Sequence, residues 1–237
     1  MGFSSAPAGW WTDLPEDIAV DVASRLQEAD VCALGACSRS WRSACDADCV
    51  WERLFRCRWP AAAPEAAAAA RVQGWKTIYI NQHRRMAAAI SNVVEFVERS
   101  LNNGSLESEY YLKAIADLAL MTDIGFLDVQ FFLFSRNHSA IINLIGLHHS
   151  IASLHVPPTE VRKALQARRV AERKVCLNLL KLGRWFYGFR LPDEHESRKI
   201  SLGGLTMVEG AEILAILSRG AVHEVFRLRI SLPSIDK

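Results

Sequence analysis

Six cysteines are the residues of this chain with the widest range of possible chemistry, and five of them fall in one short N-terminal stretch. Thiolates hold structural zinc when they occur as pairs two residues apart. The spacings here form no such pair, so we interpret the five as small side chains packed inside a helical module. The sixth lacks the pattern of a nucleophile, and we expect neither a metal nor a cofactor. The cysteines are Cys32, Cys37, Cys45, Cys49, Cys57 and Cys176.

Four histidines of the middle region could act as metal ligands or as a catalytic base. No acidic residue stands at a motif spacing from them, and adjacent histidines on a helix point in different directions. The chain also contains no GxSxG, P-loop or GxGxxG motif, so we expect a protein that is not an enzyme. A small enzyme within residues 75–237, acting through Cys176 or His149, is the alternative. The histidines are His138, His148, His149 and His155.

A basic stretch lies on the charged helix that is expected to follow Pro157-Pro158-Thr159. Two acidic residues, Glu160 and Glu172, interrupt it. We interpret the stretch as a solvated helix face. The alternative is recognition of an acidic or phosphorylated target segment, because arginine side chains bind phosphate well. The basic residues are Arg162, Lys163, Arg168, Arg169, Arg173 and Lys174.

Composition and charge limit the classes of partner. The chain has 237 residues, of which 50% are hydrophobic, and 28 basic residues nearly balance 26 acidic ones. The resulting charge of +2 gives the whole molecule no attraction to nucleic acid or anionic membranes. No segment approaches the roughly 20 apolar residues of a membrane span. With no secretory leader, and with Ala6 breaking a myristoylation pattern, we expect a nuclear or cytosolic protein without disulfides.

Residues 14–26 predict an amphipathic helix. Pro15 fits the first turn, where its missing N–H costs nothing, and two acidic residues follow it at the positive end of the helix dipole. Apolar side chains recur at every fourth position and so share one face. They are Leu14, Ile18, Val22 and Leu26.

Three more short helices are expected before residue 59. Asp30, Ser38 and Asp48 can each cap one of them. Helices this short are not stable alone in water, and burying one apolar side chain contributes about 1.5–3 kcal/mol. Together the four carry more apolar side chains than so small a bundle can bury. Either a partner protein or the rest of this chain therefore covers the remainder.

The order of motifs in this segment resembles the F-box family. The segment opens with Leu14-Pro15-Glu16-Asp17-Ile18, passes through Asp30-Val31-Cys32-Ala33-Leu34 and Cys37-Ser38-Arg39-Ser40-Trp41-Arg42, and ends with Trp51-Glu52-Arg53-Leu54-Phe55. Trp75-Lys76 resembles a tryptophan–lysine motif often found just after this module. The chain is similar to plant-like F-box proteins that lack leucine-rich, kelch or WD repeats.

The resemblance implies an adaptor-binding surface on the first helices. Trp41 is expected to contribute most to it, since buried aromatic residues dominate such interfaces, while Arg42 is expected at its rim or on an adaptor carboxylate. Trp51, Leu54 and Phe55 are expected in the internal core. The residues expected in or directly behind the interface are Leu14, Pro15, Ile18, Leu26, Val31, Leu34, Cys37, Trp41 and Arg42.

The whole chain is expected to divide into four parts. Residues 1–11 are expected to be a disordered tail, 12–59 the F-box, 60–73 an Ala/Pro-rich linker, and 74–237 a target-recruitment region. This region begins with a long helix from Trp75 and continues through several shorter ones.

The C-terminal third predicts a small antiparallel sheet with one helix on it. Thr206 and Glu209 form a capping box for that helix, which is expected to end at Gly220. The aromatic group Trp185-Phe186-Tyr187-Phe189 is interpreted as sheet core, with a ligand platform as the alternative. The expected fold class is therefore α+β, mostly α.

The resemblance implies a substrate-recognition subunit of an SCF-type ubiquitin ligase. Its F-box would bind the adaptor, and through it the cullin and RING subunits, while the C-terminal region binds an unidentified target protein. The alternative is an F-box scaffold or regulatory protein that acts outside a ligase. Neither reading involves nucleic acid or a membrane.

Overall fold

The computed structural model describes residues 14–183, 185–219 and 226–233. The chain divides into two compact units, 1–85 and 86–237, which we describe separately. The helix α6 (Trp75–Ser100) contributes residues to both. The expected tail 1–11 and the helix end at Gly220 lie outside the described residues.

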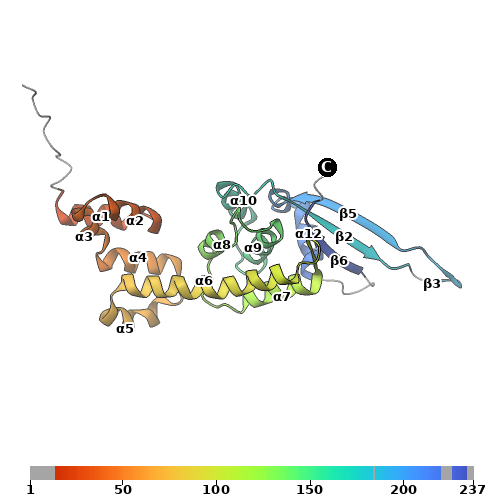
Figure 1. Cartoon of the computed structure of the whole chain (residues 1–237), viewed down its shortest axis with the longest axis horizontal. Coiled ribbons are helices and arrows are strands. Elements are labelled where there is room, and N and C mark those ends of the chain that lie inside the picture. Colours follow the sequence, from red (N-terminus) through yellow and green to blue (C-terminus); the bar gives the residue numbers. More distant parts are fainter. Residues whose placement is uncertain (1–13, 184, 220–225, 234–237) are drawn as a thin grey trace, which may run out of the picture. The chain divides into compact units, whose positions relative to one another are not determined.

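The first unit is helical (Figure 1). Its core is an aromatic cluster that joins α4 to the start of α6. The Phe55 ring lies 5.2 Å from Trp59 and 5.5 Å from Trp75, while Tyr79 lies 5.2 Å from Trp51 and 5.1 Å from Trp59. Besides the start of α6, its helices are α1 (Glu16–Ser24), α2 (Glu28–Cys37), α3 (Arg39–Cys45), α4 (Asp48–Arg58) and α5 (Ala63–Gln73).

Most of the Ala/Pro-rich stretch 60–73 is the helix α5. Alanine has the highest intrinsic helix propensity, and Pro64 occupies the first turn, where proline is tolerated. The helix buries Ala63 and Ala70. The stretch therefore belongs to the first unit, and the division between the units falls within α6.

The second unit contains α7 (Ser108–Ala119), α8 (Phe126–Phe132), α9 (Ala140–Ala152), α10 (Pro158–Ala167), α11 (Leu202–Leu205) and α12 (Val208–Arg219). Its strands are β1 (Ser105–Glu107), β2 (Lys174–Lys181), β3 (Trp185–Phe186), β4 (Phe189–Arg190), β5 (Glu194–Ser201) and β6 (Phe226–Ser231). The helix α9 is buried on every side from residue 140 to 150. The α+β, mostly helical fold class is confirmed.

Four strands form an antiparallel sheet in the order β1-β6-β2-β5. One face carries the buried residues Val175, Leu177, Leu228 and Ile230, which pack into the core of the second unit. Because side chains alternate along a strand, the residues between them point to the opposite, polar face. The sequence does not predict β1, which exists only through its pairing with β6.

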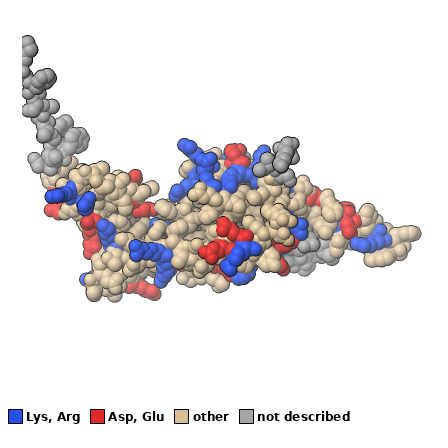
Figure 2. All heavy atoms as spheres, in the orientation of Figure 1, with Lys and Arg blue, Asp and Glu red and all other residues tan. Residues whose placement is uncertain are grey.

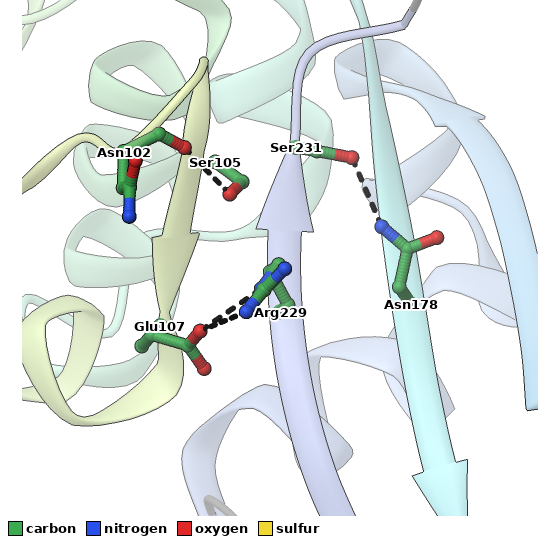
Figure 3. Close-up of polar contacts among 6 residues, drawn as sticks. All are labelled: Asn102, Ser105, Glu107, Asn178, Arg229 and Ser231. Carbon is green, nitrogen blue, oxygen red and sulfur yellow. Dashed lines mark hydrogen bonds and ion pairs between the residues drawn. The ribbon is translucent and has the colours of Figure 1, made fainter.

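Polar side chains cross-link the strands on the open face of this sheet. Glu107 of β1 accepts hydrogen bonds from Arg229 of β6 at 2.6 and 2.9 Å (Figure 3). Asn178 of β2 donates to the Ser231 hydroxyl at 3.0 Å, and accepts from Ser197 of β5 at 2.8 Å. The central strands β6 and β2 are therefore held by side-chain hydrogen bonds on the open face and by apolar packing on the other face.

Two adjacent histidines of α9 lie inside the second unit. The Tyr111 hydroxyl of α7 lies 2.7 Å from Nδ1 of His148, whose Nε2 lies 2.8 Å from the Ser218 hydroxyl of α12. Ser218 also donates to the Leu214 carbonyl, which leaves His148 Nε2 as the donor and Nδ1 as the acceptor. His149 is also buried, and neither of its ring nitrogens has a hydrogen-bond partner.

The prediction that the aromatic group is sheet core is wrong. Trp185, Phe186, Tyr187 and Phe189 are exposed by 75%, 62%, 87% and 78%. They form β3, β4 and the turn between them, at the end of the β2–β5 hairpin, which extends past the helices of the second unit (Figure 1). None of the helices that the structure describes covers either face of the hairpin at that distance from the core.

Thr206 ends α11, and its hydroxyl donates to the Gly203 carbonyl at 2.7 Å. The side chain of Glu209, the other half of the expected capping box, lies outside the described residues. The start of α11 is capped by Ser201, whose hydroxyl accepts from the Gly204 N–H. A one-turn helix therefore occupies the Gly-Gly segment.

Candidate adaptor-binding surface

Helix α1 buries its small residues and exposes its large ones. Ala19 and Ala23 are 4% and 0% exposed, whereas Ile18 and Val22 are 46% and 39% exposed. The helix therefore packs closely on its neighbours through alanine, and its aliphatic stripe points away from the unit's own core. A stripe of this kind is the expected signature of a surface that a partner covers.

Eight of the nine residues expected at the interface reach the surface of the unit. Leu14, Leu26, Leu34 and Trp41 are half-buried, and Pro15, Ile18, Cys37 and Arg42 are exposed. Val31 is 1% exposed and packs behind the others. Among the described residues of the first unit, none buries Ile18 fully, and 46% of it stays exposed.

The structure confirms only some of the helix caps that the sequence predicts. The Ser38 hydroxyl accepts from the Trp41 N–H at 3.2 Å, as expected, and so fixes the start of α3 beside Trp41. Asp30 lies inside the first turn of α2, which begins two residues earlier, so the expectation that it caps this helix is wrong.

Asp48 caps a different helix from the expected one. It lies within α4, and its carboxylate accepts from the Trp75 N–H at 2.9 Å, at the start of α6. Lys76 then pairs with Asp46 at 2.5 Å. The Trp75-Lys76 segment is therefore part of the module. Trp75 lies in the core, and Lys76 forms an ion pair with the loop before α4.

The core behind the surface holds Trp51, Leu54 and Phe55, each at most 6% exposed, as expected. Trp51 donates its indole N–H to the Cys45 carbonyl at 2.7 Å and so links α4 to the end of α3. The rigid core fixes the directions of the helices that carry the exposed side chains.

Arg58 is a second, unexpected link in this core. It lies over the Trp59 ring at 4.6 Å and donates to the Tyr79 hydroxyl at 2.8 Å, and Glu28 of α2 lies 3.6 Å away. A buried arginine is stable only with such partners. The four-residue spacing of Trp75 and Tyr79 is the signal in the sequence that could have revealed this extension of the core.

A shallow depression lies among residues of α2, α3, α4 and the start of α6. It is lined by Val31, Gly35, Arg42, Asp46, Trp51 and Lys76. Burial, with the neighbouring Asp46 carboxylate, raises the pKa of the Cys45 thiol in its wall. A protonated thiol is a poor nucleophile, so burial makes the Cys45 thiol less suited to covalent chemistry.

Neither metal sites nor membrane spans occur in the parts of the chain that the structure describes. No three His, Cys, Asp or Glu side chains gather closely enough there to hold a metal ion. No helix of those residues combines the length and apolar character needed to cross a bilayer. All six cysteines are free, and Cys32, Cys37, Cys49 and Cys57 are exposed, so the interpretation of the N-terminal five as packed side chains is correct only for Cys45.

Residues 11–57 match the family model described as F-box-like. The chain therefore carries an F-box-like domain, which supports its assignment to the F-box proteins and points to a role in protein–protein interaction. A search of curated proteins found no match to the chain. A search of solved structures found none either.

Proposed function

We propose that this chain is the substrate-recognition subunit of an SCF-type ubiquitin ligase. The F-box-like domain binds the adaptor, which brings the cullin and RING subunits, and the second unit binds the target. The observation that supports this most directly is the inverted burial of α1, where alanines face inward and Ile18 and Val22 face outward. Such a subunit increases the rate of modification by proximity and performs no bond chemistry itself.

The first experiment measures the affinity of the full chain for a purified SCF adaptor. Ile18→Asp and Val22→Asp each place a charge on the proposed interface, and we expect each to weaken binding by tenfold or more. Trp41→Ala is expected to cost at least about 2 kcal/mol, as buried aromatic anchors do.

Val72→Asp is the matched control, because Val72 is an apolar residue of the same unit that is 87% exposed on α5. It should leave adaptor affinity unchanged. The proposal fails if the folded wild-type chain does not bind the adaptor at micromolar concentration, or if the α1 variants bind as well as the wild type.

A second experiment separates the ligase from the scaffold. Purification of the tagged chain from cells should recover the adaptor together with cullin and RING subunits, and Ile18→Asp should lose all three. Recovery of the adaptor without cullin would favour an F-box scaffold that acts outside a ligase. We propose a location in the nucleus or cytosol, where these subunits meet.

A further inference from the structure

The strand β5 forms an open edge of the sheet. In the order β1-β6-β2-β5 it pairs with β2 and has no neighbouring strand on its other side in the part of the chain that the structure describes (Figure 1). The opposite edge is β1, which has only three residues, whereas β5 has eight, of which six are exposed. At about 3.3 Å per residue, the open edge is roughly 26 Å long.

The direction of the backbone groups on this edge follows from the pairing with β2. The Leu202 N–H donates to the Arg173 carbonyl at 2.9 Å, at the end of the β2–β5 ladder. In an antiparallel strand, successive residues direct their N–H and C=O groups to alternate sides. His195, Ser197 and Lys199 therefore direct theirs away from β2, and no hydrogen bond joins these backbone groups to a described residue.

A row of open backbone donors and acceptors is complementary to another β-strand. Bulges and prolines commonly prevent such pairing. The ladder between β2 and β5 runs from Lys174–Ser201 to Lys181–Glu194 without a bulge, and β5 contains no proline. Charged side chains are the other usual protection, and β5 carries them, so their arrangement determines which strand can pair with this edge.

The charges nearest the middle of β5 are arranged symmetrically about Ser197. Glu196 precedes this serine and Arg198 follows it, and the two pair with each other within the strand. Farther out, Lys181 of β2 already lies 3.8 Å from Glu194. Figure 2 shows side chains of both signs along the projecting hairpin. A strand with an acid before its centre and a base after it is complementary to an antiparallel copy of itself.

The possible registers of such self-pairing differ in the charges that they bring together. Outward-directed residues must lie opposite each other, so the two-fold axis passes through a residue. An axis through Glu196, Arg198 or Lys199 places that charged side chain opposite its own copy, which is unfavourable. An axis through Ser197 places Glu196 opposite the second copy's Arg198, and no two carboxylates or two lysine or arginine cations face each other.

We propose that two copies of the chain associate through their β5 edges, antiparallel and centred on Ser197. The two four-stranded sheets then form one continuous sheet, and the outward backbone groups of His195, Ser197 and Lys199 exchange hydrogen bonds with those of the second copy. One strand pair is a small contact, typical of weak and reversible association. The inference goes beyond the proposed function and does not depend on adaptor binding.

The test is sedimentation velocity of the full-length chain at concentrations up to about 100 µM, where we expect a reversible dimer. Arg198→Glu and Glu196→Arg each place like charges opposite each other at two symmetric positions, and each should weaken the dimer at least tenfold. Lys163→Glu is the control, because it breaks an exposed ion pair with Glu160 on α10. It should leave the dimer unchanged.

An equal mixture of Arg198→Glu and Glu196→Arg is the most specific measurement. The strand of one variant is then acidic on both sides of Ser197 and that of the other is basic, so the two should form a mixed dimer although neither dimerises alone. Recovery in the mixture excludes unfolding as the cause of the loss. Failure of the mixture to dimerise would overturn the inference.

Ser197→Pro tests the backbone contact. The Ser197 N–H points away from β2, so proline removes no bond of the β2–β5 ladder, and the dimer should weaken at least tenfold with little change in melting temperature. Ser197→Ala is the matched control, because it removes the same hydroxyl bond to Asn178 and keeps the N–H. It should dimerise as the wild type does.

Three other results would overturn the inference. They are a monomer at every concentration, a dimer that persists in Ser197→Pro and both charge variants, and a monomeric chain that recovers another protein from cells through an interaction that Ser197→Pro abolishes. The last result would assign the edge to a strand of that protein. Adaptor affinity is measured on the same samples, and its absence beside an intact dimer would contradict the proposed ligase function alone.

Discussion

Mild acid is expected to destabilise the second unit through the two buried histidines of α9. Burial lowers the pKa of His148 from 6.5 to about 4, and burial together with the neighbouring His148 lowers the pKa of His149 to about 4. The folded state therefore takes up these two protons only at lower pH than the unfolded state does. The stability that this difference provides is complete above about pH 6.5 and is lost as the pH falls toward 4.

The size of the effect follows from the pKa values. One pKa unit corresponds to about 1.4 kcal/mol. At pH 5.0 the unfolded chain has bound both protons and the folded unit neither, so each histidine is expected to cost about 2 kcal/mol relative to pH 7.5. For a domain whose total stability is on the order of 5–15 kcal/mol, the loss is large.

The assay is unfolding in guanidinium chloride, followed by circular dichroism at pH 7.5, 6.0 and 5.0. His149→Leu removes one of the two titrating groups and should remove about half of the loss between pH 7.5 and 5.0. His195→Gln is the control, because His195 is exposed on β5. Equal stability of the wild type at pH 7.5 and 5.0, or an undiminished loss in His149→Leu, would refute the role given to these histidines.

Three further substitutions are expected to change the free energy of unfolding at pH 7.5, measured by the same method. His149→Leu should stabilise the chain by about 1–2 kcal/mol, because it removes two buried nitrogens without partners. Asp48→Ala should destabilise it by about 1 kcal/mol, since α6 loses its cap. Gly146→Ala should cost about 1–3 kcal/mol, because the new Cβ would lie 2.9 Å from Leu133 Cβ.

Matched controls exist for the last two. Asp30→Ala removes an exposed aspartate from the first turn of α2 and should have a smaller effect than Asp48→Ala. Gly35→Ala adds a Cβ whose closest contact is 3.4 Å, and should stabilise α2 by about 0.5–1 kcal/mol. Equal effects at Gly35 and Gly146 would contradict the packing described around α9.

Local patterns predicted the first four helices and the long helix α6, because these elements depend on short-range periodicity and on residues such as Pro15 and Ser38. The partner of Asp48 could not be predicted, because the Trp75 N–H it binds lies 27 positions away. Local preference makes an aspartate a good cap for α4, and only the tertiary fold brings it to α6. The strand β1 was missed for a related reason, since three residues form a strand only beside β6.

The sequence predicted less well which residues lie at the surface and which lie in the core. The four-residue spacing in α1 predicts a shared aliphatic face but does not say whether the chain itself covers it. Alternation along the β2–β5 hairpin likewise does not reveal where the covering helices end. Aromatic residues are usually buried, and this general tendency gave the wrong prediction for Trp185 and its neighbours.

The place of β6 in the sheet has a consequence for how the protein is made on the ribosome. This strand is synthesised after all the other described elements, yet it lies between β1 and β2. The second unit therefore cannot close its sheet until residues 226–231 have left the exit tunnel, whereas the aromatic core of the first unit is complete after Tyr79. A nascent chain can thus present a finished F-box-like domain while its other half still lacks a central strand.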